Sequence, residues 1–474
     1  MAGIDPTDLF VDRHNGPRKA DVDFMLRALG VDSLESLSTA VIPEGIRAAD
    51  ELKLPQALTE QQAIAKLSGL ASKNQVMRSY LGLGYADCVT PPVILRNILE
   101  NPGWYTQYTP YQAEISQGRL EALLNFQTLI SDLTGLEISN SSLLDEATAA
   151  AEAMTLCQRV LGRKNKATAF FVSEHCHPQT IALMETRAEP LGLTILVGDH
   201  ETFDFSTPVL GALIQYPHSN GEVLDYSPFA DRVHQAGGLL VVAADLMSLC
   251  LLRPPGEFGA DVVVGNSQRF GVPLGFGGPH AAFMATSEAY KRQIPGRIVG
   301  VSKDVHGNPA LRLALQTREQ HIRRDRATSN ICTAQVLLAV VASMYAVYHG
   351  QDGLTSIARR IRTHAGWLEE RLVELGYTQK NSVYFDTLRF SQGPKSSEEI
   401  QSAALGLGIN LRLDGDAVVV ALDESVESED LRDLIKAFGG SDLGEQVEEP
   451  QLTDTHRRQT QFCTHPTFSR YQSE

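Results

Sequence analysis

Six short apolar runs between residues 81 and 330 constrain the fold of this chain more than any other feature. They span residues 167–173, 194–197, 210–216, 239–245, 262–264 and 281–285. Their hydrophobicity is continuous rather than alternating, which is typical of strands buried on both faces. Helical patterns such as 178–187 and 229–236 lie between several of them. The pattern predicts a doubly wound α/β domain with a mainly parallel sheet covered by helices.

The 474 residues provide enough chain for two or three domains. Residues 1–80 contain short helical patterns and predict an arm that packs on something else. Residues 81–330 form the predicted large domain. Residues 331–440 predict a smaller C-terminal α/β domain with strands at 382–386 and 417–422. Residues 441–474 contain few apolar side chains, which favours an extended tail or linker.

Charge and cysteine usage exclude several classes of protein. A formal net charge of -16 argues against nucleic acid or an anionic membrane as partner, because phosphate binding needs clustered Lys and Arg. No apolar run approaches the length needed to span a bilayer, and the first residues lack the features of a signal sequence. Six scattered cysteines without a C-x-x-C pair favour free thiols in a reducing compartment. We therefore expect a soluble, cytoplasmic protein.

Metal binding is not predicted. In the stretch His175-Cys176-His177, the two histidines share one face of an extended segment and the thiol lies on the other. A metal site usually needs three or four converging ligands, so structural histidines are the favoured interpretation.

Residues 261–280 form a predicted strand, a short turn and a glycine-rich loop. Enzymes that use pyridoxal phosphate (PLP) present their Schiff-base lysine in this layout. The position most like that lysine is Gln268. An amide nitrogen is neither basic nor nucleophilic, so we expect this chain to bind no PLP covalently.

Only one of two further marks of a PLP site is present. Asp245 ends a predicted strand, where an acid could pair with the pyridinium nitrogen. The helix that opens at 145–152 could receive a phosphate, but it carries alanines instead of glycine and two acids, Asp145 and Glu146, that would repel an anion. A vestigial or structural role for Asp245 is therefore favoured. A self-contained PLP enzyme using Lys303 or Lys291 is a separate possibility, and a nicotinamide enzyme is disfavoured because no Gly-x-Gly-x-x-Gly follows a strand.

Two other segments are dense in polar groups. Residues 104–118 crowd tyrosines, a carboxylate and amides around a proline. Composition alone supports a functional loop and a surface turn about equally. In the arginine-rich stretch 316–332, Ser329 and Asn330 could cap the following helix. A helix cap flanked by arginines is also a natural phosphate binder.

Several long motifs together resemble the amino-terminal half of the glycine cleavage system P-protein family, glycine dehydrogenase (decarboxylating). They are residues 85–102, Tyr108-Thr-Pro-Tyr-Gln-Ala-Glu-Ile-Ser-Gln-Gly118, 143–153, 267–280 and 316–324. The resemblance covers nearly the whole chain. It implies the fold of the aspartate-aminotransferase group of PLP enzymes. In that family two such halves are joined in one chain or form separate subunits of an α2β2 heterotetramer. The tail from Thr464 resembles the connector between joined halves.

The resemblance also implies a function. Only the carboxy-terminal half, or subunit 2, carries the lysine, in a His-Lys-x-Phe stretch that Ser267–Phe270 mirrors. That partner holds the PLP, glycine loses CO2, and the aminomethyl group passes to the lipoyl H protein. This chain would then be inactive alone. The alternative is a non-catalytic PLP-fold scaffold or regulatory subunit.

Five residues are predicted to act across the interface between the halves. Tyr108, Tyr111 and Glu114 would line the glycine and lipoyl pocket of the partner. Ser329 and Asn330 would approach the phosphate of its PLP.

Overall fold

The computed structural model describes residues 10–14, 16–48, 52–106, 110–162, 165–329 and 335–473. The chain divides into two compact units, residues 1–76 and 77–474.

The first unit consists of short helices: α1 (Phe10–Arg13), α2 (Lys19–Leu29), α3 (Leu34–Val41) and α4 (Glu60–Ala71). Local sequence sets their ends. The α2 helix stops at Gly30 in the left-handed conformation, and Thr59 caps α4 by accepting a hydrogen bond from the Gln62 backbone. Ser33 caps α3 by accepting a hydrogen bond from the Ser36 backbone. The boundary lies slightly before the expected residue 80, because β1 (Arg78–Ser79) pairs with β13 of the second unit.

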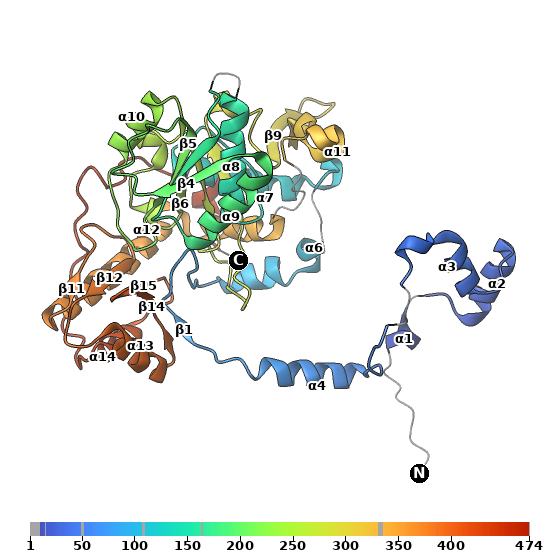
Figure 1. Cartoon of the computed structure of the whole chain (residues 1–474), viewed down its shortest axis with the longest axis horizontal. Coiled ribbons are helices and arrows are strands. Elements are labelled where there is room, and N and C mark those ends of the chain that lie inside the picture. The colour runs from blue at the N-terminus through green and yellow to red at the C-terminus, as the bar shows by residue number, and fades with distance from the viewer. Residues whose placement is uncertain are drawn as a thin grey trace, which may run out of the picture. The chain divides into compact units, whose positions relative to one another are not determined.

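The second unit is built around a seven-stranded sheet with the order β2-β8-β7-β6-β5-β3-β4 (Figure 1). Its strands are β2 (Ile138–Ser139), β3 (Ala169–Ser173), β4 (Thr194–Gly198), β5 (Val209–Tyr216), β6 (Leu239–Asp245), β7 (Val262–Asn266) and β8 (Ala282–Thr286). Strands β4, β3, β5, β6 and β7 run parallel, and β8 runs antiparallel to both of its neighbours, β7 and β2. The six apolar runs therefore correspond to six of these strands, and the mainly parallel sheet is confirmed.

Helices cover both faces of this sheet. Alternate residues along β6 enter different cores: Leu240 and Val242 face one, and Val241 and Ala243 face the other. The first core is shared with α7 (Gln117–Thr134), α10 (Ser227–Gln235) and the first part of α12 (Val336–Glu374). The second is shared with α8 (Glu146–Leu161) and α9 (Pro178–Ala188). Burial on both faces explains why the runs are continuously apolar.

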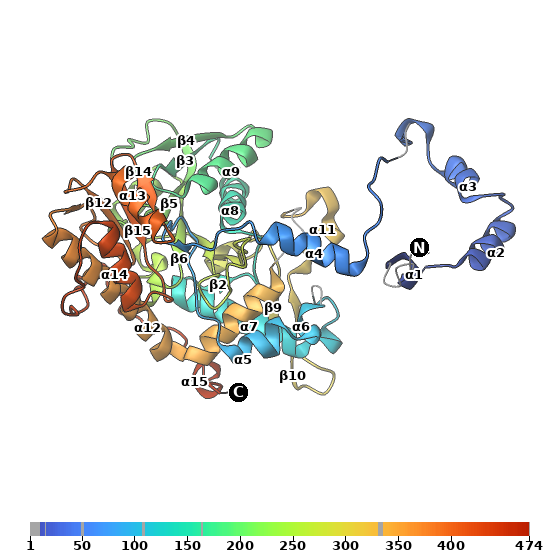
Figure 2. The ribbon, with the colours of Figure 1, turned by 90° about the horizontal axis from the view of Figure 1, so that it is seen from below.

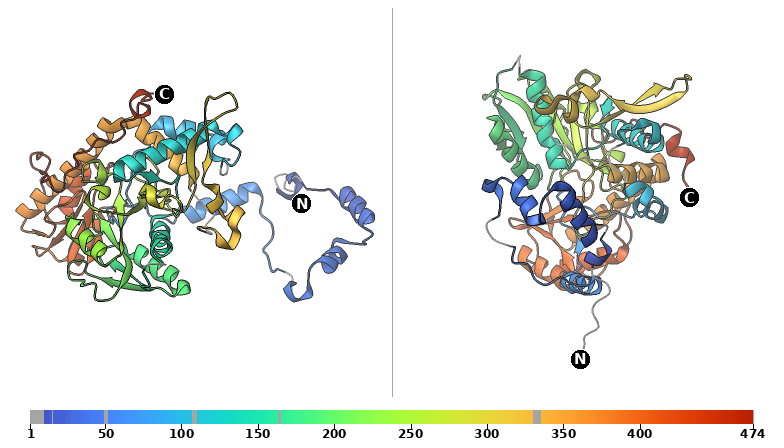
Figure 3. Two further views of the ribbon diagram at one scale, coloured as in Figure 1. Left: turned by 90° about the horizontal axis from the view of Figure 1, so that it is seen from above. Right: turned by 90° about the vertical axis from the view of Figure 1, so that its right-hand side faces the viewer.

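A two-stranded hairpin, β9 (Ile298–Lys303) and β10 (Pro309–Ala314), extends from the large domain (Figure 3). Shorter helices of this unit are α5 (Pro92–Ile94), α6 (Pro102–Tyr105) and α11 (Gln320–Arg323), together with the 3-10 helix η3 (Ala113–Ile115).

A smaller α/β subdomain follows within the second unit. Its antiparallel sheet has the order β11-β12-β15-β14, comprising β11 (Thr378–Gln379), β12 (Thr387–Ser391), β15 (Ala417–Ala421) and β14 (Arg412–Asp414). Strand β13 (Ile409–Asn410) and helices α13 (Ser397–Gly406) and α14 (Ser428–Ala437) complete it. The strand predicted at 382–386 is wrong. Those residues form only an isolated bridge, Glu222 to Tyr384, because they link the two domains and the strand begins at Thr387.

The long α12 helix joins the two domains (Figure 2). It kinks at Gly350, where φ is 63°, and a Cβ there would lie 2.7 Å from the Phe468 carbonyl oxygen. Residues before the kink pack in the first core, whereas Leu368 and Leu372 pack in the core of the small domain. The expected boundary at residue 330 therefore precedes a helix that belongs to both domains.

The segment 441–474, expected as an extended tail, packs against the large domain along its described residues. Leu452, Phe462 and Phe468 are buried in the first core, and α15 (Thr467–Arg470) lies beside α12. The guanidinium of Arg458 donates to the carbonyl oxygens of Leu133 and Leu249, both at 2.9 Å. Leu133 is in the last turn of α7, so a cation satisfies the carbonyls of a helix C-terminus. Few apolar residues suffice because this arginine anchors the segment.

None of the described helices is long and apolar enough to cross a lipid bilayer.

Candidate functional site

The parallel strands end at one edge of the large sheet, where open α/β folds bind ligands. Polar residues follow β3, β5, β6 and β7 at this edge. They are His175, His177, His218, Ser219, Asp245, Asn266, Gln268 and Arg269.

Gln268 lies just beyond β7 and is completely buried. Its Nε2 donates to the backbone oxygens of Ala86, at 2.9 Å, and Val272, at 2.6 Å. The amide therefore fastens the turn after β7 to the segment that precedes α5. This side chain is a structural tie rather than a reactive group.

Asp245 is occupied by a protein cation. Arg269 donates from Nη1 to Asp245 Oδ2 at 2.9 Å and also to Asp386 of the small domain. Burial raises the pKa of the Asp245 carboxyl and Arg269 offsets part of that rise. Burial alone would lower the pKa of Arg269, but the two carboxylates raise it well above its usual value. Asp245, Arg269 and Asp386 therefore form an ion triad, and Asp245 is not available to pair with a pyridinium nitrogen.

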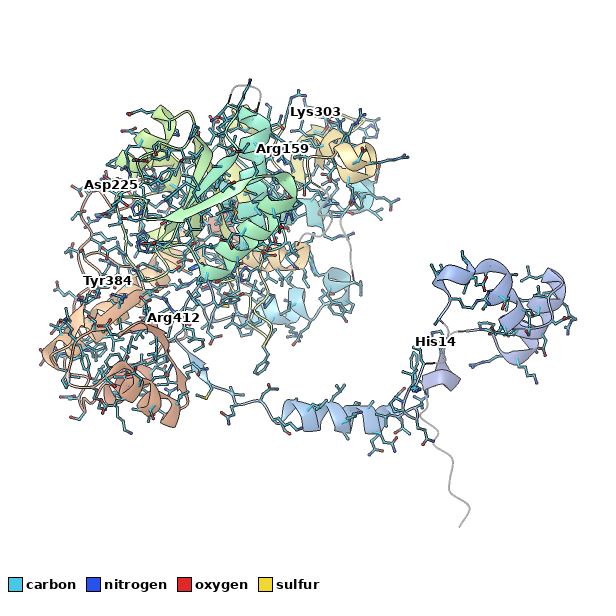
Figure 4. The ribbon with its side chains drawn as sticks, in the orientation of Figure 1. His14, Arg159, Asp225, Lys303, Tyr384 and Arg412 are labelled. Atoms are coloured by element: carbon cyan, nitrogen blue, oxygen red, sulfur yellow. The ribbon has the colours of Figure 1, made fainter. Side chains whose placement is uncertain are left out.

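The space around this triad is small. The cavity lined by Asp245, Arg269 and Asp386 holds about 70 Å³, whereas sites for cofactors and drug-sized ligands usually occupy about 300–1,000 Å³. Among the described residues that line it there is no lysine. Lys303 is exposed on the hairpin, where Figure 4 labels it, and Lys291 pairs with Glu288 on the surface.

A cavity of about 470 Å³ lies at the N-terminus of α8, but the acids there disfavour a phosphate. Asp145 caps the helix by accepting from the Thr148 backbone N–H at 2.8 Å and from its hydroxyl at 2.7 Å. Glu146 is buried beside it, and burial raises the pKa of its carboxyl to about 7. Together with Gln268 and Arg269, these residues do not fit a bound PLP.

The histidines at this edge contact one another and neighbouring hydroxyl groups. His175 and His218 stack with ring centroids 4.5 Å apart, and His177 Nδ1 lies 2.9 Å from the Ser219 hydroxyl. Burial lowers the pKa of His177 to about 3 and that of His218 to about 2, so both are neutral at pH 7. Within the described ranges, no group of three His, Cys, Asp or Glu side chains could hold a metal ion.

Arg412 of β14, labelled in Figure 4, ties the small domain to the same edge. Its guanidinium donates to the backbone oxygens of Ser219 and Leu81, the latter at 3.2 Å. Arg269 and Arg412 thus hold the two domains together across the region where a cofactor would otherwise lie.

Adding a lysine should not recreate the cofactor site. We expect the Gln268→Lys variant to show no visible absorption of a PLP Schiff base after incubation with PLP, because Arg269 already pairs with Asp245, the cavity beside the triad is small, and α8 begins with two acids. Absorption spectra and retained PLP after dialysis measure this, with a PLP enzyme that keeps its lysine as positive control. One equivalent of bound, coloured PLP would contradict the steric argument.

Two of the predicted interface residues lie in or near η3. Tyr111 and Glu114 are exposed, and Tyr108 lies outside the described residues. Arg297 holds Tyr111: it contacts the tyrosine hydroxyl, and its guanidinium carbon is 5.2 Å from the ring centroid. Glu319 Oε2 lies 3.9 Å from Nη2 of Arg297, the same nitrogen that contacts Tyr111. Sequence reasoning missed Arg297, because it lies 186 residues beyond Tyr111 and only the fold brings the two side chains together.

Ser329 contacts helix α8. Its hydroxyl donates to Glu152 Oε1 on α8 at 3.1 Å, and Arg187 donates to the same oxygen at 3.1 Å. Asn330 lies outside the described residues. Nearby, the buried Arg318 donates to the backbone oxygens of Ile294 and Gly296, the latter at 3.0 Å, so this member of the arginine-rich stretch is structural.

Comparison with known proteins places these features in a family. Residues 12–438 match the model of the glycine cleavage system P-protein family. The chain is 58% identical over 477 residues to a glycine dehydrogenase (decarboxylating) of Nostoc sp., an alignment that covers 98% of this chain and 48% of the relative. The chain therefore spans about half the length of the curated relatives it matches.

Solved structures agree. A crystal structure of glycine decarboxylase, the P-protein of the glycine cleavage system, superimposes with a TM-score of 0.79 at 35% identity, covering 90% of this chain and 99% of the other. A C-DES variant with glycine covalently linked to its PLP cofactor shares the fold, with a TM-score of 0.53 at 13% identity and coverage of 78% and 97%. The large and small domains thus share the fold of glycine decarboxylase and of a PLP-dependent enzyme. On this evidence the chain belongs to the glycine cleavage system P-protein family.

Proposed function

We propose that this chain is the half of a glycine decarboxylase that lacks the Schiff-base lysine. It works with the lysine-bearing half, which holds PLP. Together the two halves remove CO2 from glycine and transfer the aminomethyl group to the lipoyl H protein. Alone, the chain is inactive.

One observation supports this proposal most. The chain covers only 48% of the length of its relative, and the sheet edge where its PLP-type fold would hold the cofactor does not fit PLP. Gln268 stands at the position of the lysine, and Arg269 forms an ion pair with Asp245. The cavity beside the pair, about 70 Å³, is too small for PLP. We therefore assign the chemistry to the lysine-bearing half, where PLP would supply the electron sink for decarboxylation.

The contribution of this chain is proposed to be the loop that contains Tyr111 and Glu114. An exposed apolar surface lies beside it: Ile115 is 74% exposed, and Val301 and Val305 on the hairpin are 70% and 93% exposed. The Gln117 side chain bonds the Leu311 backbone at 3.0 and 2.8 Å, which keeps the loop next to the hairpin. Apolar groups around exposed polar ones are typical of a surface that meets a partner.

Within that interface, each side chain has a proposed task. The Glu114 carboxylate would accept or orient a proton of the glycine or lipoyl group. Tyr111, held by Arg297, would line the same pocket, and Tyr108 would lie with them. Ser329 and Asn330 would approach the partner's PLP phosphate. That role needs the Ser329 hydroxyl to turn from Glu152, or to donate to the phosphate through a neighbouring group.

Reconstitution tests the proposal. We expect the purified chain to release no CO2 from glycine, and a mixture with the lysine-bearing half and lipoyl H protein to catalyse exchange of bicarbonate with the glycine carboxyl. The lysine-bearing half with H protein but without this chain is the control. Equal exchange without the chain would favour the alternative, a non-catalytic scaffold or regulatory subunit. Exchange by this chain alone would refute both.

A further inference from the structure

Two cavities adjoin at the edge of the large sheet that does not fit PLP. The outer cavity, about 470 Å³, lies at the N-terminus of α8, and the inner cavity, about 70 Å³, lies beside the ion triad. They share four lining residues, Gly84, Tyr85, Glu146 and His177. A compound in the outer cavity can therefore extend a small group into the inner one.

The inner cavity contains a hydrogen-bond acceptor without a donor. Gln215 is 2% exposed, and its Oε1 has no hydrogen-bond partner among the described residues. Its Nε2 donates to Glu146 Oε1 at 3.4 Å, which orients the amide. Buried polar atoms of proteins are nearly always hydrogen-bonded. The Oε1 atom therefore needs a donor from outside the chain.

His177 supplies a second acceptor. It is 8% exposed, and its Nδ1 lies 2.9 Å from the Ser219 hydroxyl. When the neutral ring carries its proton on Nδ1 and donates it to Ser219, the other nitrogen, Nε2, is an acceptor. Nε2 makes no hydrogen bond to the part of the chain that the structure describes. It faces Gly84, where an added Cβ would lie 3.3 Å away, so the absence of a side chain there keeps the space open.

The walls of the two cavities carry an excess of negative charge. Among the described lining residues the acids are Asp145, Glu146, Asp245 and Asp386, whereas Arg269 is the only Lys or Arg. Arg269 is shared by Asp245 and Asp386. Glu146 is buried without a cation, and burial, Asp245 and Asp145 raise the pKa of its carboxyl to about 7. A water molecule would supply donors here but would leave this charge uncompensated.

A primary ammonium group matches these walls, because it combines three donors with one positive charge. The outer cavity offers Tyr85, Leu144 and Leu183 to an apolar stem.

We propose that Glu146, Gln215 and His177 bind the ammonium group of a small alkylamine whose apolar stem lies in the outer cavity. Amino acids are disfavoured, because their carboxylate would lie beside Asp145. The site goes beyond the proposed function and does not depend on it, because every group that it uses belongs to this chain.

Calorimetry with n-butylamine tests the site on the full purified chain. We expect one butylamine to bind per chain, and butyrate, glycine and inorganic phosphate to bind more weakly. Glu146→Gln keeps the shape of the side chain but removes its charge, so binding should weaken about 10- to 100-fold, the loss of one charge-assisted hydrogen bond. The matched control is Glu185→Gln, at an exposed position on α9, which should bind like the unsubstituted chain.

Proton release gives a second measurement that needs no variant. Burial lowers the pKa of His177 and His280 and raises that of the Cys176 thiol, so these neighbours of Glu146 are neutral at pH 7. Because the ammonium group favours the ionised carboxyl, binding at pH 7 should release about half a proton from Glu146. Titrations in two buffers of different ionisation enthalpy measure this release, and the affinity should rise from pH 6 to pH 8.

Four results would refute the site. Absence of saturable binding of butylamine would mean that the cavities hold only water. Equally tight binding of butyrate or phosphate would exclude a cationic ligand, and equally tight binding of glycine would exclude selection against a carboxylate. Unchanged affinity and proton release in Glu146→Gln, with circular dichroism showing a folded chain, would place the amine elsewhere. The proposed function is tested separately, with the lysine-bearing half.

Discussion

Replacing Arg269 by methionine is expected to lower the free energy of unfolding by about 3–5 kcal/mol, the cost of removing one partner from a buried ion pair. The substitution keeps a long apolar stem but leaves Asp245 and Asp386 facing each other without a cation. Asp386 comes from the small domain, so its attachment to the large domain is weakened too. Urea unfolding followed by tryptophan fluorescence and circular dichroism measures the loss.

The size of this loss should depend on pH. Burial raises the pKa of Asp245 and Arg269 lowers it, so removal of the arginine raises it further. A carboxyl whose pKa is raised in the folded state favours folding below its unfolded value and loses that benefit as pH rises through the folded pKa. The deficit of Arg269→Met relative to the unsubstituted chain should therefore be largest at neutral pH and shrink towards pH 4.

A matched control separates this effect from the loss of any arginine. Arg389 pairs with Asp414 at 2.7 Å, but the two side chains are 25% and 45% exposed. Arg389→Met should cost less than about 1 kcal/mol, as exposed pairs do. Equal losses for the two variants, or a deficit for Arg269→Met that grows on acidification, would show that the buried triad does not connect the domains.

The large sheet could be predicted from sequence because burial on both faces leaves a local signal, an unbroken apolar run. The small domain was harder. Residues 382–386 contain Tyr384 and Phe385, which are buried like strand residues. Their backbone instead bonds side chains of other elements, as when Ser382 N–H donates to Glu222 at 3.1 Å. Composition alone does not distinguish a buried irregular segment that connects two domains from a strand.

Long-range side-chain bonds explain the other differences. The segment after 441 resembles a linker by its low apolar content, but Arg458 bonds a carbonyl 325 residues earlier. The same limit applies to the cofactor edge. Gln268 and Asp245 could be selected because each follows a strand in the sequence. The triad could not, since Asp386 lies 117 residues beyond Arg269 in another domain. The one signal in the sequence was Arg269 itself, since an arginine next to Gln268 in a buried turn needs acidic partners.

Glu114→Gln is expected to lower the rate of glycine–bicarbonate exchange by the reconstituted halves about 100-fold, at the low end of what a positioned acid or base contributes. The substitution removes a carboxylate from an exposed loop without disturbing the core, so the stability of the chain should not change. Because Glu114 would act in the reaction rather than in assembly, kcat should fall while the affinity between the halves is retained. Exchange rates at saturating glycine, with binding of the halves measured in parallel, test this.

Two further variants show whether the effect is specific to the loop. Glu185→Gln removes a carboxylate from an exposed position on α9, which covers the face of the sheet opposite α7, and should leave exchange unchanged. Tyr111→Phe keeps the ring over Arg297 but loses the hydroxyl contact, so a smaller decrease of about 10-fold is expected for one lost hydrogen bond to a charged group. If Glu114→Gln turns over glycine at the unsubstituted rate, the carboxylate has no part in the chemistry. If it weakens assembly as much as it slows exchange, the loop is a docking contact, and the partner half must supply every group that touches the substrate.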